Sequence, residues 1–203
     1  MAKPKSASFY LRGVMGILVL APALAAVLFS SPWLKTGRWA DLAFFGAGCA
    51  LAWCGGLLRL WAIVYIGGRK GNEVVSKGPY ACCRNPLYLG SLLVGLSFAF
   101  FTRSASVFVA ILVLSTLYLS LVVTSEEKQL EGLFGQAWRD YVAGVPRLFP
   151  RLAWKSEKRV EVDLRAFKNE TLRLTGIALI PLFMTAVAAL RTLEGWPRLF
   201  TLP

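Results

Sequence analysis

The chain has 203 residues, 56% of them hydrophobic, and its 23 Lys and Arg against 11 Asp and Glu give a formal net charge of +12. This composition, with a mean hydropathy of +0.57, is too apolar for an ordinary soluble domain and predicts a single integral membrane domain over residues 1–203. The absence of histidine excludes Ser-His-Asp and Cys-His catalysis and removes the commonest metal ligand, so we expect no metal site.

Five apolar runs follow one another along the chain. They cover residues 13–29, 39–66, 87–101, 106–123 and 174–190. Runs of this length predict transmembrane helices, and we therefore expect an all-α integral membrane protein with about five spans. The first run follows a short basic head, so a cleavable signal peptide is an alternative. Ser30-Ser31-Pro32-Trp33 is typical of an interfacial turn with an aromatic anchor, and it favours a retained span.

The second run is longer than a perpendicular crossing needs, so we expect it to be tilted or to continue beyond the membrane. Its glycines favour the close approach of another helix. Arg59 within it is compatible with two roles that the sequence leaves open: its side chain reaches the headgroup region, or it lines a polar site. The third and fourth runs are joined by residues 102–105 alone and predict a tight, slightly short helical hairpin.

The four cysteines show neither the spacing of a zinc site nor that of a secreted disulfide framework. Cys49 and Cys54 lie inside the second run, where we expect them to pack within the membrane. Cys82 and Cys83 lie in a polar loop and are compatible with a redox or lipidation role.

The basic residues predict the orientation of the helices. The N-terminal head, the segment from Arg59 to the loop before residue 87, and residues 128–173 together hold 18 of the 23 Lys and Arg. By the positive-inside rule these segments face the cytoplasm of a prokaryotic inner membrane, and residues 151–173 form a basic cytoplasmic segment before a C-terminal span at 174–190. The basic residues flank apolar runs and do not gather with aromatics on a polar domain, which favours membrane lipids over nucleic acid as partners.

A turn-rich polar segment occupies residues 78–90, at the start of the third run. Asn85 and Pro86 have a plain structural interpretation, in which Asn caps the helix and Pro occupies its first turn. Tyr80 and Tyr88 are not needed for such a turn. Gly90 lacks a side chain, which lets another group come close.

A second polar segment, residues 126–150, follows the fourth run. If the helix continues from that run, one face carries Glu126, Leu130, Leu133, Phe134, Ala137 and Tyr141. Glu126 and Glu127 oppose the macrodipole at the cytoplasmic end of a span, where cations are preferred. A solvated pair is one explanation, but a cationic ligand faced by Tyr and Trp rings accounts for the placement better. Because the two polar segments flank a hairpin, we expect them to meet at the cytoplasmic face as one site.

Together the two segments carry a resemblance to a known family. Their pattern is Gly-Pro-Tyr-x-x-x-Arg-Asn-Pro-x-Tyr-x-Gly, then an apolar hairpin, then Glu-Glu-x-x-Leu-x-x-x-Phe-Gly-x-x-Trp-x-x-Tyr-x-x-x-Val-Pro-Arg-x-x-Pro. It resembles the isoprenylcysteine carboxyl methyltransferase family, which is related to the phospholipid N-methyltransferases. The resemblance implies a methyltransferase-like core over residues 71–150 that binds S-adenosyl-L-methionine at the cytoplasmic face through residues 78–90 and 126–150. It also implies a lipid-like or prenylated acceptor that enters from the bilayer.

The resemblance further implies the residues of the site. The expected cofactor-binding positions are Tyr80, Arg84, Asn85, Pro86, Tyr88, Leu89, Gly90, Glu126, Glu127, Leu130 and Tyr141, and the expected catalytic positions are Arg147, Glu126 and Glu127. Asn85 stands where the family usually has histidine. Its amide still donates and accepts hydrogen bonds but cannot titrate.

The expected reaction is an in-line displacement at a sulfonium methyl, which needs no metal and depends largely on holding donor and acceptor close. A carboxylate acceptor needs no base, whereas an amine acceptor leaves Glu126, Glu127 or a tyrosine as the base. Arg147, in a segment between two prolines that cannot be a regular helix, either anchors the interface or orients an anionic acceptor group. Two alternatives stay open: an NADPH-dependent membrane reductase resembling the C-terminal part of sterol reductases, and a non-catalytic lipid-binding member of the fold.

Overall fold

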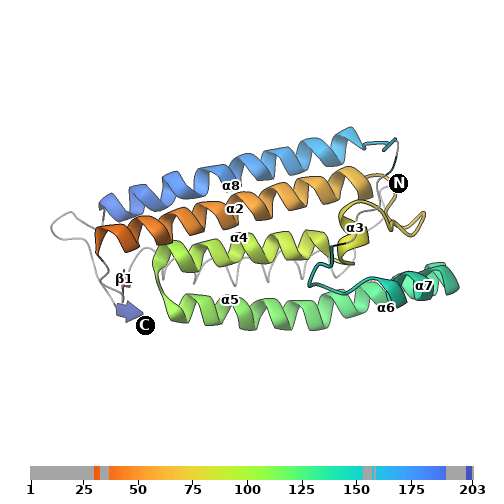
Figure 1. Cartoon of the computed structure of the whole chain (residues 1–203), viewed down its shortest axis with the longest axis horizontal. Coiled ribbons are helices and arrows are strands. Elements are labelled where there is room, and N and C mark those ends of the chain that lie inside the picture. Colours follow the sequence, from red (N-terminus) through yellow and green to blue (C-terminus); the bar gives the residue numbers. More distant parts are fainter. Residues whose placement is uncertain (1–29, 33–36, 153–156, 158, 191–199, 203) are drawn as a thin grey trace, which may run out of the picture.

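The computed structural model describes residues 30–32, 37–152, 157, 159–190 and 200–202. Four long helices lie side by side in a row, in the order α8, α2, α4 and α5 (Figure 1). Their bounds are Arg38–Ile66 for α2, Pro86–Thr102 for α4, Ala105–Tyr118 for α5 and Leu164–Leu190 for α8. The segments 67–85 and 124–150 gather at one end of this row, which we name the polar end.

Short helices build the polar end. Helix α3 covers Pro79–Cys82, α6 covers Thr124–Phe134 and α7 covers Gln136–Gly144. A π-helical segment, η1 over Leu119–Val123, joins α5 to α6 without a break in the chain's helical path. Such π segments occur frequently at functional sites, because they change which side chains share a helix face.

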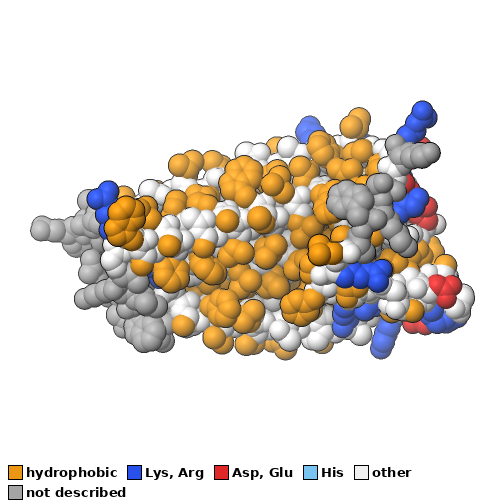
Figure 2. Space-filling view, viewed as in Figure 1, with side chains coloured by type: hydrophobic (Ala, Val, Ile, Leu, Met, Phe, Trp, Pro, Cys, Tyr) orange, Lys and Arg blue, Asp and Glu red, His pale blue; other side chains and the backbone are white. Residues whose placement is uncertain are grey.

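The long helices are consistent with a multi-pass membrane protein. Within the described residues, Arg38–Ile66, Ala105–Phe134 and Leu164–Leu190 are long and apolar enough to cross a membrane, and α4 is a shorter apolar helix. At 1.5 Å per residue α4 is about 25 Å long, slightly less than a bilayer core of about 30 Å. Figure 2 shows hydrophobic side chains over the long helices and most charged ones at the polar end. The predicted first span, residues 13–29, lies outside the described residues.

Helix α8 is longer than the predicted last span, and the helix expected after the fourth run is divided in two. Helix α8 begins at Leu164 and includes residues 174–190, so part of the basic segment 151–173 is also helical. The helix face predicted from Glu126 to Tyr141 is interrupted, because Gly135 has a φ of 54° and ends α6. This left-handed backbone conformation strains any residue with a side chain, so the chain continues as the separate helix α7.

A short β ladder was also not predicted. Residues Ser30–Pro32 form β1 and Phe200–Leu202 form β2, and the two strands pair in parallel. The interfacial turn expected at residues 30–33 is therefore extended over its described part. The remaining regular elements of the described residues are all helices, joined by loops.

Glycines set the contact between α2 and α4. A Cβ added to Gly55 would lie 2.5 Å from the Gly90 carbonyl oxygen, and one added to Gly90 would lie 2.7 Å from the Gly55 oxygen. Because these atoms belong to the backbone, neither position has room for a side chain. The Gly90 Cβ would also lie 2.5 Å from Arg59 Cγ. The close approach expected at Gly90 is thus filled by α2, and it holds Arg59 against α4.

Candidate functional site

A cavity of about 670 Å³ opens at the polar end of the helix row. Its walls come from all four long helices, from α6 and α7, and from the loop after α2. The charged residues that line it are Arg59, Lys70, Arg84, Arg173, Glu73, Glu126, Glu127 and Glu170. The aromatic residues that line it are Tyr80, Tyr88, Tyr118, Phe134, Trp138 and Tyr141. Both polar segments singled out in the sequence therefore contribute to one cavity.

Most of the residues expected at the site line this cavity. They are Tyr80, Arg84, Asn85, Pro86, Tyr88, Glu126, Glu127, Leu130 and Tyr141. Leu89, Gly90 and Arg147 are not among the lining residues. Gly90 faces α2, and Arg147 pairs with the lining residue Glu127.

The Glu126 carboxylate contacts a phenol and a lysine. The Tyr88 hydroxyl donates to Glu126 Oε2 at 2.9 Å, and Lys70 Nζ lies 3.8 Å from Oε1. The Tyr88 ring packs against Tyr118 with centroids 5.5 Å apart, which fixes its direction. Because the Lys70 side chain is 67% exposed, its charge is well solvated and screens Glu126 only weakly. The Glu126 carboxylate thus lines the cavity beside a phenol and a solvated lysine.

Glu127 is held by two cations and an amide. Arg84 Nη1 lies 3.5 Å from Oε1 and Arg147 Nε lies 3.4 Å from Oε2. Asn85 Nδ2 donates to Glu127 Oε1 at 3.2 Å and to the Arg147 carbonyl oxygen at 3.1 Å. Arg147 Nη2 also donates to Thr124 Oγ1 at 2.6 Å. Through these ion pairs, Glu127 of the second polar segment contacts Arg84 of the first and Arg147 of its own segment.

These contacts correct the plain interpretation of Asn85. Its side chain makes no capping hydrogen bond, although Pro86 does occupy the first turn of α4 as expected. The amide instead bridges a carboxylate and a carbonyl across the site. A histidine at this position could make the first of these contacts with a ring N–H.

Further hydrogen bonds fasten the second polar segment to the first. The Arg84 amide donates to the Pro146 carbonyl at 2.9 Å, and the Arg151 amide donates to the Cys82 carbonyl at 3.1 Å. The Tyr141 hydroxyl donates to the Tyr80 carbonyl at 2.8 Å in a buried contact. The structure thus brings together the two segments that the sequence predicted would meet.

Two lining side chains carry buried polar atoms without a protein partner. They are the Tyr80 hydroxyl and Arg84 Nε, within the described part of the chain. Burial raises the pKa of Tyr80 and of Tyr141 well above the ordinary value, so both phenols stay protonated at neutral pH. Buried donors without partners are costly, and a bound polar or anionic group would satisfy them.

A second charged group lines the cavity where α2, α4 and α8 meet. It contains Arg59, Glu170 and Arg173, and its carboxylate is buried to 2% exposure. Arg59 therefore lines a polar site, which resolves the choice that the sequence left open. Glu170 and Arg173 were not predicted, and the available signal was only that they lie directly before the apolar run 174–190.

Comparison with known proteins assigns the family. Residues 43–137 match the family described as phospholipid methyltransferase. The cobalt-zinc-cadmium resistance protein CzcN of Cupriavidus metallidurans is 33% identical over 169 residues, which cover 80% of this chain and 76% of that protein. This chain belongs to the phospholipid methyltransferase family. The resemblance to the related isoprenylcysteine carboxyl methyltransferases is thereby confirmed at family level.

Another relative supports the similarity over nearly the whole length. The nickel-cobalt-cadmium resistance protein NccN of Alcaligenes xylosoxydans xylosoxydans is 27% identical over 192 residues, which cover 94% of this chain and 89% of that protein. No solved structure matches the chain. The family match at 43–137 includes the cavity residues from Arg59 to Leu130 but not Tyr141 or Glu170.

Proposed function

We propose that this chain is an S-adenosyl-L-methionine-dependent integral membrane methyltransferase. Its acceptor is a lipid-like or prenylated molecule, methylated on a carboxylate oxygen or an amine nitrogen. The observation that carries the proposal is a cavity that combines an acidic, aromatic end with apolar walls from membrane-length helices. Membership of the phospholipid methyltransferase family supports it.

The residues of the cavity fit this cofactor. Its volume of about 670 Å³ lies within the usual range of ligand sites, roughly 300–1,000 Å³. Glu126 and the rings of Tyr88 and Trp138 suit a sulfonium or ammonium cation, which carboxylates and aromatic faces both attract. Arg84 and Tyr80, with their unpartnered donors, suit the carboxylate of an amino acid moiety. When bound, the cofactor supplies an electrophilic methyl group on sulfur.

The side chains then have distinct tasks. Glu127, fixed by Arg84 and Arg147, holds the loop and the helix that frame the cofactor in one arrangement. Apolar side chains of α4 and α5, including Leu92, Leu114 and Leu117, exclude water from the acceptor side. For a carboxylate acceptor no proton moves. For an amine acceptor, Glu126 takes the proton that the nitrogen releases as it gains the methyl group.

The arrangement of the helices offers the acceptor a route from the bilayer. Helices α5 and α8 both line the cavity, although α2 and α4 lie between them in the row. Leu114 and Leu117 of α5 are 37% and 50% exposed. An apolar acceptor tail can therefore lie against α5 while its head reaches the polar end.

The decisive experiment is incubation of the purified chain with native membranes and S-adenosylmethionine tritiated on the methyl group, followed by identification of the labelled lipid. Calorimetric titration with S-adenosylhomocysteine and with NADPH is run in parallel. Binding of NADPH without S-adenosylhomocysteine would favour the reductase. Binding of S-adenosylhomocysteine with no labelled product from any lipid extract would favour a non-catalytic lipid-binding protein.

The names of the two relatives suggest a physiological setting. Both are metal resistance proteins, and we propose that methylation by this chain supports growth in the presence of such metals. Expression of the wild type and of Glu126→Gln in a Cupriavidus metallidurans strain lacking CzcN tests this setting. Equal metal tolerance from both variants would show that methylation is not the contribution.

A further inference from the structure

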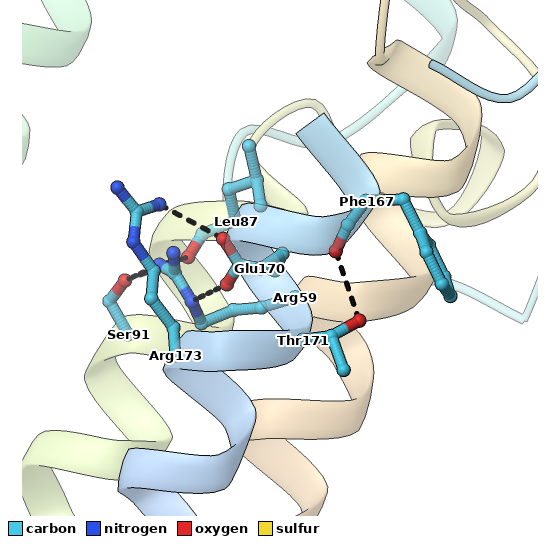
Figure 3. A network of polar contacts seen from close by, with 7 residues as sticks. All are labelled: Arg59, Leu87, Ser91, Phe167, Glu170, Thr171 and Arg173. Atoms are coloured by element: carbon cyan, nitrogen blue, oxygen red, sulfur yellow. Dashed lines mark hydrogen bonds and ion pairs between the residues drawn. The ribbon is translucent and has the colours of Figure 1, made fainter. Parts of the chain in front are cut away.

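Three helices meet at a cluster of charge around the buried Glu170, at one wall of the cavity (Figure 3). Arg59 of α2 donates through Nε to Glu170 Oε1 of α8 at 2.7 Å, and Arg173 of α8 donates through Nη1 to Glu170 Oε2 at 3.0 Å. Arg59 Nη1 donates further to the Leu87 carbonyl of α4 at 3.3 Å and to the Ser91 hydroxyl. We name Arg59, Glu170 and Arg173 the arginine cluster.

The arginine cluster carries one positive charge more than its own pairing requires. Glu170 is 2% exposed and already pairs with Arg59, whose side chain is 17% exposed. This single pair would neutralise the buried carboxylate. Arg173 adds a second guanidinium and is 66% exposed, so it retains capacity for another anion.

The lining cations belong to two groups. Lys70 and Arg84 lie 3.8 and 3.5 Å from Glu126 and Glu127, whereas the arginine cluster lies where α2, α4 and α8 meet. An anionic group of an acceptor therefore has cationic partners at this wall that are separate from Arg84. The arginine cluster favours the anionic group, because guanidinium matches carboxylate and phosphate oxygens in planar, two-point contacts.

The position of Arg59 and the apolar wall beside it favour a membrane ligand. Arg59 precedes Ile66, the last residue of α2, by a distance along the helix of about 10 Å. An ionisable residue inside an apolar helix of membrane length is costly and commonly marks a functional site. The leucines of α4 and α5 continue the cavity wall with hydrocarbon, as an acyl or prenyl tail requires.

We propose that the arginine cluster binds the anionic group, phosphate or carboxylate, of a membrane-embedded acceptor. Glu170 and Ser91 position Arg59, and Arg173 supplies the second guanidinium. The inference rests on the proposed methyltransferase function and assigns to Arg59 and Arg173 the orienting role that the sequence analysis considered for Arg147. Arg147 does not line the cavity, and its guanidinium is engaged by Glu127 and Thr124.

The test uses the full chain in a neutral maltoside detergent, titrated by calorimetry. The probes are dihexanoyl phosphatidic acid, dihexanoylglycerol as its neutral counterpart, inorganic phosphate and S-adenosylhomocysteine. Arg173→Gln leaves the Arg59–Glu170 pair intact and is the variant least disturbing to folding. The double variant Arg59→Gln with Glu170→Gln removes the buried pair without leaving a lone charge. The matched control is Arg139→Gln, because Arg139 also pairs with a glutamate, at 3.3 Å, but lies outside the cavity.

We expect the wild type to bind phosphatidic acid more tightly than either the neutral glycerolipid or free phosphate. Arg173→Gln and the double variant should each weaken this binding about tenfold, with S-adenosylhomocysteine affinity unchanged within about twofold, the scale of losing one charge-assisted contact. Arg139→Gln should change neither affinity.

The proposal is wrong if Arg173→Gln and the double variant both bind phosphatidic acid as tightly as the wild type while still binding S-adenosylhomocysteine. The arginine cluster would then only hold the three helices together. Equal affinity for free phosphate and for the lipid would show a soluble anion as the ligand and overturn the lipid assignment. Failure of the wild type to bind S-adenosylhomocysteine would overturn the methyltransferase function instead, and the separate lipid titration distinguishes that result from failure of the anion site.

Discussion

We expect neutralisation of Glu126 and of Glu127, two adjacent residues of α6, to impair different properties of the protein. Glu126 has a hydroxyl donor and a distant, exposed lysine as partners, whereas Glu127 lies between two arginines and an amide. In Glu126→Gln the amide oxygen can still accept from Tyr88, so this hydrogen bond is kept. In Glu127→Gln the arginines lose their shared counterion. We therefore expect Glu126→Gln to impair ligand binding and Glu127→Gln to impair stability.

The magnitudes follow from these contacts. Removing the Glu126 charge costs the ammonium group of S-adenosylhomocysteine one charge-assisted hydrogen bond, about 1.5–3 kcal/mol or roughly ten- to a hundredfold in affinity. Glu127→Gln loses two ion pairs at 3.4 and 3.5 Å, with Arg84 mostly buried and Arg147 half-buried. Each pair of this length contributes about 1 kcal/mol when partly shielded. A loss of about 2 kcal/mol lowers the Tm of a chain of this size by roughly 4–8 °C.

Calorimetry with S-adenosylhomocysteine and thermal unfolding in the same detergent measure the two effects. Glu131→Gln is the control, because Glu131 lies on the same helix and pairs with Arg139 outside the cavity. We expect it to match the wild type in both assays. Equal loss of affinity in Glu126→Gln and Glu131→Gln, or a larger Tm loss in Glu126→Gln than in Glu127→Gln, would refute the division of roles.

Three further predictions concern packing, the irregular segment and the buried thiol. Gly90→Ala should lower the free energy of unfolding, measured by thermal unfolding, by about 1–3 kcal/mol, because its Cβ would overlap the backbone of α2. The control is Gly46→Ala, since a Cβ at Gly46 in α2 meets open space. This variant should instead raise the free energy of unfolding by about 0.5–1 kcal/mol. Arg147→Lys should lower the Tm, because it loses the Thr124 hydrogen bond, and should leave the KM for the acceptor unchanged. A raised KM in that variant would restore the acceptor-orienting role. Burial raises the pKa of the Cys83 thiol to about 11, so the thiol stays protonated below that pH. Maleimide should therefore label Cys83 at pH 7.5 only after unfolding. Mass spectrometry of the labelled peptides measures this labelling.

Much of this protein follows from local sequence. The alternation of membrane-length apolar runs with polar segments predicted the long helices, because backbone groups in a bilayer must be satisfied within a helix. The turn signals at residues 78–90 and the prolines at 146 and 150 predicted irregular chain at the polar end. The two-segment motif predicted the family, and most of the site residues that it implied line the cavity, including Tyr80, Tyr88 and Glu126.

Tertiary structure decided what each of these residues does. From the sequence, the Asn85 side chain could cap its own helix. In the folded protein its amide donates instead to Glu127 of α6 and to the Arg147 carbonyl, which only the packing of the segments brings within reach. Gly90 could admit any close neighbour, and the neighbour is Gly55 of α2. The pairing of Arg59 with Glu170 joins residues 111 apart in the chain, and no local pattern specifies which buried charge will meet which. Helix periodicity and turn chemistry act over a few residues. The charge partners in this cavity depend instead on how the helices pack, and this packing is determined by all the helices of the row together.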